Sequence, residues 1–168
     1  MKERIVYKGR VINLSVRDLP LPDGGRSAVE VIGHPGAVLV APFLLDGSLM
    51  MVRQYRPVIG RYIYEFPAGT RRRGEPYLKC AARELREETG LSSRRFARLG
   101  EIYPVPGYST EKIVIYRADR AVRGQCRRER DEFMENVQMK KKEAADLFRA
   151  GGMIDAKTIC ALAFLGII

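Results

Sequence analysis

The chain has 168 residues and a formal net charge of +10, from 30 Lys and Arg against 20 Asp and Glu. Hydrophobic residues make up 46% of it and charged residues 30%, a balance typical of soluble globular proteins that excludes an intrinsically disordered chain. At this length one domain over residues 1–168 is expected, large enough to bury a substantial core.

Neither secretion nor membrane insertion is expected. The charged start MKERIVYKG has no apolar signal segment, and the apolar run ICALAFLGII is too short for the ~20 residues that cross a bilayer. Cys80, Cys126 and Cys160 lie far apart without a CxxC pair, so neither a disulfide framework nor a zinc site is predicted. A reducing cytoplasm is the expected location.

Basic residues gather in four stretches, 71–73, 94–95, 123–130 and 140–142. One interpretation is solvated surface, and the other is attraction of a polyanion, either a phosphorylated small molecule or nucleic acid. The sequence contains no RGG array and no aromatic RNA-binding stretch, so nucleic acid is not the expected partner.

In chain order, β-branched and alternating segments predict strands, and Gly, Pro and Asp mark the turns. Strands are expected over 4–22 and 27–32, joined by a turn at 22–25, and over 36–45, largely buried, 48–56 and 62–69. The segments 98–108 and 111–118 are expected to form a strand, a proline-bearing loop and a second strand, and a short strand follows a charged loop at 123–132. Helices are expected after Pro76 and over 141–152 and 155–166. Alternating strands and helices with hairpins between them predict an α/β (α+β) domain with a mixed sheet.

The helix after Pro76 carries the pattern that is most informative about function. Pro76 suits its first turn, and Gly90 suits a left-handed stop at its end. An apolar stripe is expected to face the core, formed by Leu78, Ala81, Ala82 and Leu85.

Three glutamates, Glu84, Glu87 and Glu88, fall within an arc of roughly 100° beside that stripe. Like charges three and four residues apart repel each other on a helix, so a bound cation is one explanation for the cluster. Carboxylates at this spacing suit Mg²⁺, which commonly bridges to substrate phosphates. A chance cluster on the surface is the alternative.

The surroundings of these glutamates resemble the Nudix box over residues 69–91 at every specified position: Gly69, Glu75, Arg83-Glu84-Leu85, Glu87-Glu88 and Gly90-Leu91. Further segments resemble the ADP-ribose pyrophosphatase branch of that family: GHPGAVLVAP, MVRQYRP, YEFPAG, YPVPGYSTEKI, DEFMENV and DAKTICAL. Pro106 stands where the branch carries its subfamily proline. The resemblance implies a Nudix-type α/β/α sandwich with an N-terminal antiparallel hairpin.

The activity implied by this resemblance is Mg²⁺-dependent hydrolysis, with Mn²⁺ as an alternative ion, of a nucleoside diphosphate sugar. ADP-ribose would give AMP and ribose 5-phosphate. The implied metal ligands are Glu84 and Glu88, with Glu87 supporting them and the carbonyl of Ala68 completing the shell. Arg83 would orient the carboxylates, and Glu75 would brace the loop.

For the general base, the resemblance points to Glu132, with Glu129, Glu135 and Glu111 as alternatives. The basic run RGQCRRER before this loop, and Glu-Asn-Val where relatives have Glu-Val-Val, both depart from the family pattern.

The implied substrate contacts begin with Arg56, which suits a bidentate contact to the diphosphate. Arg53 would assist it or form a salt bridge at the strand edge, and Glu65 would bind the substrate or anchor its loop. His34, the only histidine, is expected to make a structural hydrogen bond.

Glu30 matches a residue that contacts adenine in some relatives, where the N-terminal hairpin crosses to a second subunit. The resemblance thus implies a homodimer, with N-terminal strands over about residues 1–35 and a catalytic core over 36–168.

Two other functions stay open. The chain could hydrolyse another nucleoside diphosphate derivative, a GDP-sugar or an oxidised nucleotide. The residues of the Nudix box recognise the phosphates and the metal, so they do not determine which base is bound. It could also be a Nudix-fold module that binds RNA or a nucleotide without hydrolysis. The intact set of Glu84, Glu87 and Glu88 favours catalysis over simple binding.

Overall fold

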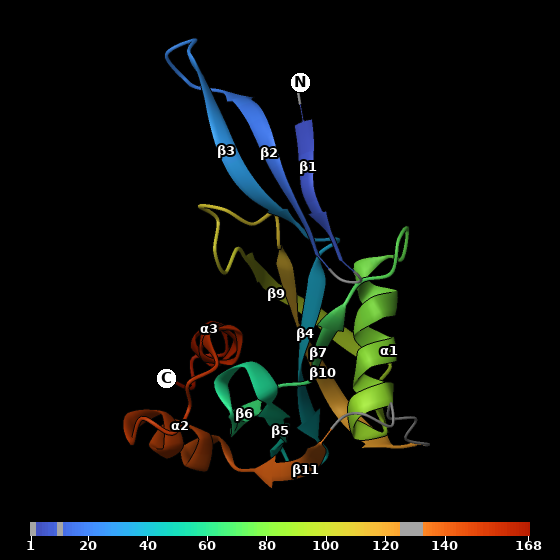
Figure 1. The fold of residues 1–168 in the computed structure, drawn as a ribbon. Coiled ribbons are helices and arrows are strands. Elements are labelled where there is room, and N and C mark those ends of the chain that lie inside the picture. Colours follow the sequence, from blue (N-terminus) through green and yellow to red (C-terminus); the bar gives the residue numbers. More distant parts are fainter. Residues whose placement is uncertain (1–2, 10–11, 125–132) are drawn as a thin grey trace.

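The computed structural model describes residues 3–9, 12–124 and 133–168. Its N-terminal part is a three-stranded antiparallel sheet in the order β1-β2-β3, formed by β1 (Glu3–Lys8), β2 (Asn13–Pro20) and β3 (Arg26–Gly33). The expected turn over 22–25 joins β2 and β3, and Gly24 takes the left-handed conformation that the turn needs (φ 85°). This sheet projects away from the rest of the molecule (Figure 1).

The second sheet is mixed and has eight strands among the described residues, in the order β11-β5-β4-β10-β8, with β6, β7 and β9 paired to β5, β4 and β10. Its strands are β4 (Ala37–Leu44), β5 (Leu49–Arg56), β6 (Arg61–Glu65), β7 (Ala68–Thr70), β8 (Leu91–Ser92), β9 (Arg95–Ile102), β10 (Ile113–Arg123) and β11 (Met134–Met139). The central pair, β4 and β10, is parallel. The expected strand over 62–69 is divided into β6 and β7, because Pro67 lacks the N–H that a continuous ladder requires.

Helices cover both faces of this sheet (Figure 1). Along β4, Val38 and Val40 pack in the core cluster under α1 (Tyr77–Thr89), whereas Leu39 and Ala41 pack in the cluster on the other face. That second face is covered by α2 (Lys141–Arg149) and α3 (Ala156–Phe164). A short 3-10 helix, η1, spans Pro57–Ile59. Alternate strand residues point to opposite faces, so a strand buried on both sides needs the nearly continuous apolar sequence of β4. The α/β/α sandwich with a mixed sheet is confirmed.

The orientation of α1 differs in part from the expectation. Leu78 is 49% exposed and Ala82 is exposed as well, so these two members of the predicted stripe do not face the core. The buried face is formed by Cys80, Ala81, Glu84, Leu85, Glu88 and Thr89. The prediction was wrong because it assigned the inner face to apolar residues alone, while the helix turns two of its glutamates toward the sheet.

The ends of α1 follow from its sequence. Pro76 stands one position earlier than predicted, as the residue that precedes the first turn. Gly90 ends the helix in the left-handed conformation (φ 71°), as predicted. Within the described ranges, every helix falls short of the length and hydropathy that a membrane span requires.

Candidate active site

Arg83 is the centre of an ion-pair network on α1. Its Nε and Nη2 atoms donate to the two carboxylate oxygens of Glu75, both at 2.9 Å, while Nη1 donates to Glu84 Oε1 at 2.5 Å and to Glu87 Oε2 at 2.9 Å. Nη2 also donates to the carbonyl oxygen of Thr70 at 3.2 Å. The hydrogen bonds that Arg83 donates to Glu75 outweigh the effect of burial and raise the pKa of Arg83. This single guanidinium therefore fixes three carboxylates of the predicted motif relative to β7.

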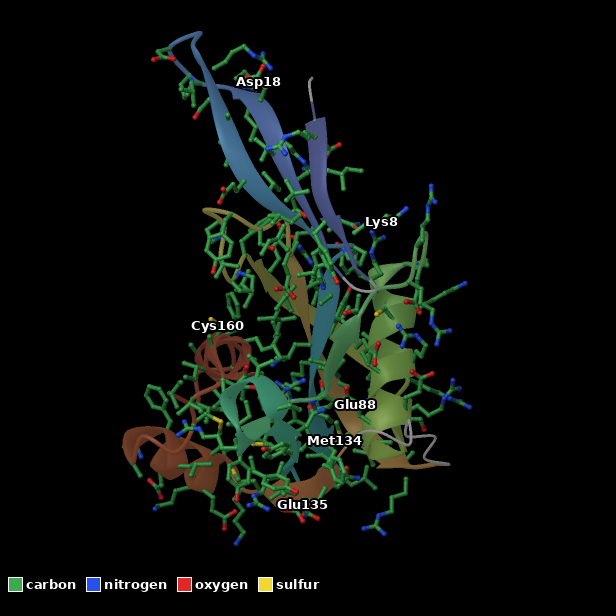
Figure 2. All side chains as sticks on the ribbon, viewed as in Figure 1. Lys8, Asp18, Glu88, Met134, Glu135 and Cys160 are labelled. Carbon is green, nitrogen blue, oxygen red and sulfur yellow. The ribbon has the colours of Figure 1, made fainter. Side chains whose placement is uncertain are left out.

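Two of the glutamates, Glu84 and Glu88, are each only 7% exposed. Figure 2 shows Glu88 on the side of α1 that faces the sheet, and its Oε2 accepts a hydrogen bond from the Ala68 backbone N–H at 3.1 Å. Burial raises the pKa of Glu84, and the opposing effect of Arg83 does not cancel this. Buried carboxylates need a compensating charge or hydrogen bonds, and here both are supplied by Arg83 and the β7 backbone.

Gly69 on β7 explains how this strand and α1 approach each other so closely. A Cβ atom at this position would overlap the carboxyl group of Glu84, so only glycine leaves room for that carboxylate. The result is a cluster of hard oxygen donors: Glu84 and Glu88 lie next to the backbone at Ala68–Gly69, and Arg83 links Glu87 to Glu84.

The chemistry of this donor set suits a hard divalent cation. In the described conformation the three carboxylates do not converge on one point: no group of three His, Cys, Asp or Glu side chains in residues 3–9, 12–124 and 133–168 could hold a metal ion. Arg83 Nη1 bridges Glu84 and Glu87 instead. A cation held by all three glutamates therefore requires their carboxylates to turn away from these partners.

A cavity of about 350 Å³ opens beside the backbone at Ala68–Gly69. Its polar lining includes Arg56, Glu111, Asp155 and Lys157, and the rest is formed by Ala37, Val38, Ala68, Gly69, Thr70, Pro104, Ile113 and Ala156. Ala68 and Gly69 thus have the cavity on one side and the buried glutamates on the other. The cavity therefore places Arg56 and Lys157 around the same backbone against which Glu84 and Glu88 lie.

The cations of this cavity are held by one buried carboxylate. Glu65, 2% exposed, accepts from Arg56 through Nε at 3.2 Å and Nη2 at 2.5 Å, and from Lys157 Nζ at 2.9 Å. Lys157 also donates to Asp155 Oδ1 at 2.8 Å. Although burial disfavours the charged guanidinium, the bonds to Glu65 prevail and raise the pKa of Arg56. Glu65 thus anchors Arg56 and Lys157 rather than lining the cavity itself.

Lys157 and Asp155 were not predicted from the sequence. Asp155 caps α3 by accepting from the Thr158 N–H at 3.0 Å, which places Lys157 in the first turn. A lysine near a helix N-terminus faces unfavourable dipole charge. A lysine in the first turn of a helix, as in the sequence DAKT, was therefore the signal that could have identified Lys157 as a candidate substrate contact.

Three predicted substrate contacts lie away from the cavity. Arg53 donates to Glu135 Oε1 at 2.8 Å and stacks over the ring of Tyr62, which is the salt-bridge alternative considered for it. Glu30 is exposed on β3, and Pro106 lies in the turn over 105–108. The proline that lines the cavity is Pro104.

The predicted general bases divide into three cases. Glu132 and Glu129 lie outside the described residues. Glu135 is on β11 (Figure 2). Its side chain is 59% exposed and is paired to Arg53. Glu111 lines the cavity, and its Oε1 is 3.9 Å from His34 Nε2. His34 makes the expected structural hydrogen bond, because its Nδ1 accepts from the Gly36 N–H at 3.1 Å.

Comparison with known proteins finds relatives along nearly the whole chain. ADP-ribose pyrophosphatase of Bacillus subtilis (strain 168) is 36% identical over 98% of this chain and 89% of its own length. A methanol dehydrogenase activator of Bacillus methanolicus is 33% identical over 98% of this chain and 90% of its own length. In fold, the chain is similar to a crystal structure of an ADP compounds hydrolase, with a TM-score of 0.84 and 24% identity over 99% of this chain and 90% of that one.

The profile of the NUDIX domain matches residues 33–161. That range contains α1, the cavity and the network around Arg83. The protein therefore belongs to the NUDIX domain family.

Proposed function

We propose that this Nudix hydrolase cleaves the diphosphate bond of ADP-ribose or a related nucleoside diphosphate sugar, and that it uses Mg²⁺ or Mn²⁺ to do so. The products would be AMP and a sugar phosphate, ribose 5-phosphate in the case of ADP-ribose. The observation that carries the proposal is the single cavity that joins Arg56 and Lys157 to the backbone at Ala68–Gly69, directly against the buried Glu84 and Glu88.

The residues of this cavity suit a diphosphate. Arg56 and Lys157 supply two positive charges on one wall, and charge-assisted hydrogen bonds to phosphate oxygens are among the strongest that proteins make. Because Glu65 already holds both cations in place, little side-chain entropy is lost when the substrate binds. Arg53, Glu30 and Pro106 remain proposed contacts to the outer parts of the substrate.

We assign Glu84, Glu88 and the Ala68 carbonyl to the metal, with Glu87 as a further ligand and Arg83 as the residue that orients them. A bound divalent ion would neutralise the diphosphate and lower the pKa of water near it. The buried position of Glu84 and Glu88 limits competing water, and Gly69 leaves space for the carboxylate.

For the proton-accepting carboxylate we keep Glu132 as the first proposal, from the family resemblance. Glu111 is the second, supported by its position in the cavity lining opposite His34. Replacing Glu132 and Glu111 by glutamine, one at a time, distinguishes these two proposals. Substitution of the residue that acts as the base should lower kcat with little effect on substrate affinity.

We also propose that the enzyme is a cytoplasmic homodimer, with strands over about residues 1–35 forming the contact and residues 36–168 the catalytic core. Ile5, Val6 and Tyr7 on the edge strand β1 support this, since they are 63%, 49% and 60% exposed. An exposed apolar edge strand is a surface that proteins usually cover. Sedimentation velocity of the wild type and of Ile5→Asp/Tyr7→Asp tests it: a monomeric wild type contradicts the proposal.

The experiment for the activity is phosphate-coupled hydrolysis of a substrate panel with Mg²⁺, with Mn²⁺ or with EDTA. The panel contains ADP-ribose, ADP-glucose, GDP-mannose, NADH, diadenosine polyphosphates and 8-oxo-dGDP. Metal-dependent turnover that favours ADP-ribose is expected. Turnover of only GDP-mannose or 8-oxo-dGDP would show that the proposed substrate class is wrong. Nucleotide binding without any turnover would show that the protein binds nucleotides and does not hydrolyse them.

A further inference from the structure

A second, larger cavity lies at the opposite end of β10 from the candidate active site. Its volume is about 480 Å³, and we call it the arginine cavity; it is lined by Ser92, Ser93, Arg94, Arg95, Asp119, Arg120 and Val122. None of these residues lines the active-site cavity, which contacts β10 at Ile113. From Ile113 to Arg120 the strand extends ~23 Å at its usual rise per residue, so the two cavities are separate.

The backbone around the arginine cavity is held in a defined shape. Between Ala118 and Ala121 the pairing of β10 with β4 shifts by one residue, so β10 carries a bulge at Asp119–Arg120. Ser93 Oγ donates to the Asp119 carbonyl at 2.6 Å and accepts from the Arg95 N–H at 2.9 Å. These bonds tie the connection between β8 and β9 to the bulge, and so bring Arg94 and Arg95 next to Arg120.

Among the described residues, these three arginines have no acidic partner. By contrast, Arg98 pairs with Glu101 and Arg26 with Asp18. Within the described part of the chain, the guanidinium groups of Arg94, Arg95 and Arg120 make no ion pair or hydrogen bond. Asp119, the acidic residue among the described lining residues, is already engaged, because its Oδ1 accepts from Arg117 Nε at 2.7 Å. Three cations therefore line the same cavity without an acidic partner in the described part of the chain.

Arg120 also adopts a conformation that its side chain disfavours. Its φ is 51°, and it is the one described residue other than glycine with a positive φ. Glycine would satisfy this backbone without strain, whereas arginine adopts it at a cost in stability. Strained positions of this kind persist where a side chain is needed for another reason.

We propose that the arginine cavity is a second binding site, specific for ligands with a diphosphate or longer polyphosphate group. Guanidinium groups match phosphate oxygens in both charge and planar geometry, and three of them offset the charge of a diphosphate. The hydroxyl groups of Ser92 and Ser93 add donors at the same wall. The site binds the anion independently of catalysis, and it accounts for part of the +10 charge that the active site does not use.

The test is isothermal titration of the full chain with inorganic pyrophosphate in EDTA, at ~50 mM salt so that the charges are only weakly screened. We use three variants: Arg120→Gly, Arg94→Gln/Arg95→Gln, and Arg56→Ala in the active site. The wild type should bind pyrophosphate at two sites. Arg120→Gly and Arg94→Gln/Arg95→Gln should each weaken one site at least roughly tenfold, and Arg56→Ala should weaken only the other.

Two controls keep the result interpretable. Arg98→Gln removes an exposed arginine from the same strand, β9, whose partner is Glu101, and should leave both sites intact. Arg120→Gly keeps the left-handed backbone, so its melting temperature should equal or exceed that of the wild type while one site is lost. Repeating the titration with ADP shows whether a nucleoside adds affinity at this site. A single site that disappears with Arg56→Ala, or two sites unaffected by Arg120→Gly, overturns the proposal.

Discussion

The carboxyl group of Glu84 lies against Cα of Gly69, so closely that a side chain at residue 69 would overlap it. We predict that Gly69→Ala displaces this carboxylate and lowers kcat/KM for ADP-ribose by roughly tenfold or more, because small misplacements of catalytic groups are costly. The fold should survive, since the end of a glutamate side chain can move aside. Steady-state kinetics and thermal melting check both points.

Gly107→Ala is the matched control for this substitution, because a Cβ at Gly107 meets no atom within 4 Å and its φ is not positive. It should leave kinetics and melting temperature unchanged. Equal activity of Gly69→Ala and the wild type would show that the Gly69–Glu84 approach has no role in catalysis.

Lys157 is predicted to bind substrate phosphate. Replacing it by methionine removes one charge-assisted hydrogen bond, worth about 1.5–3 kcal/mol, and should raise KM for ADP-ribose roughly 10- to 100-fold. Lys157→Arg should recover much of the loss. Lys142→Met, on the exposed face of α2, is the control. If KM of Lys157→Met stays at the wild-type value, the assignment of Lys157 fails.

The pair of Glu75 and Arg83 predicts a pH dependence of stability. The hydrogen bonds from Arg83 lower the pKa of Glu75 from 4.5 to about 2. A carboxylate with a depressed pKa contributes stability that is fully present above 4.5 and is lost as the pH falls toward 2. Urea unfolding should therefore find Glu75→Gln less stable than the wild type at pH 7, with a smaller difference at pH 3. A difference that does not change with pH would contradict this.

Cys80 is predicted to be chemically inert in the folded protein. Burial, reinforced by the charges of Glu84 and Glu75, raises the pKa of its thiol to about 12, so almost no thiolate forms near neutrality. Labelling with iodoacetamide at pH 8, followed by peptide mass spectrometry, should modify Cys80 only after urea is added. Rapid labelling in the native state would refute the prediction.

Much of this architecture could be predicted because it is encoded locally. The stop of α1 at Gly90, the turn before β3 and the buried strand β4 each depend on residues within a few positions of the element. The spacing of Glu84, Glu87 and Glu88 in the sequence likewise predicts that the three lie near one another on one helix.

The remaining features depend on contacts between distant segments. Lys157 reaches Glu65 across 92 positions and Arg53 pairs with Glu135 across 82, and no local pattern records such a pairing. The exposure of Leu78 has the same origin, since periodicity alone cannot show that the sheet accepts two carboxylates in preference to a leucine.

The measurement that tests the central claim most directly is hydrolysis of ADP-ribose with Mg²⁺ by the wild type and by Glu88→Gln. The substitution keeps size and hydrogen bonding to the Ala68 N–H but removes the charge that a cation needs. We predict metal-dependent turnover by the wild type and a loss of roughly 100-fold or more in the variant, with an unchanged melting temperature. A Glu88→Gln protein that retains most of the wild-type activity would contradict the assignment of this buried glutamate to the metal site.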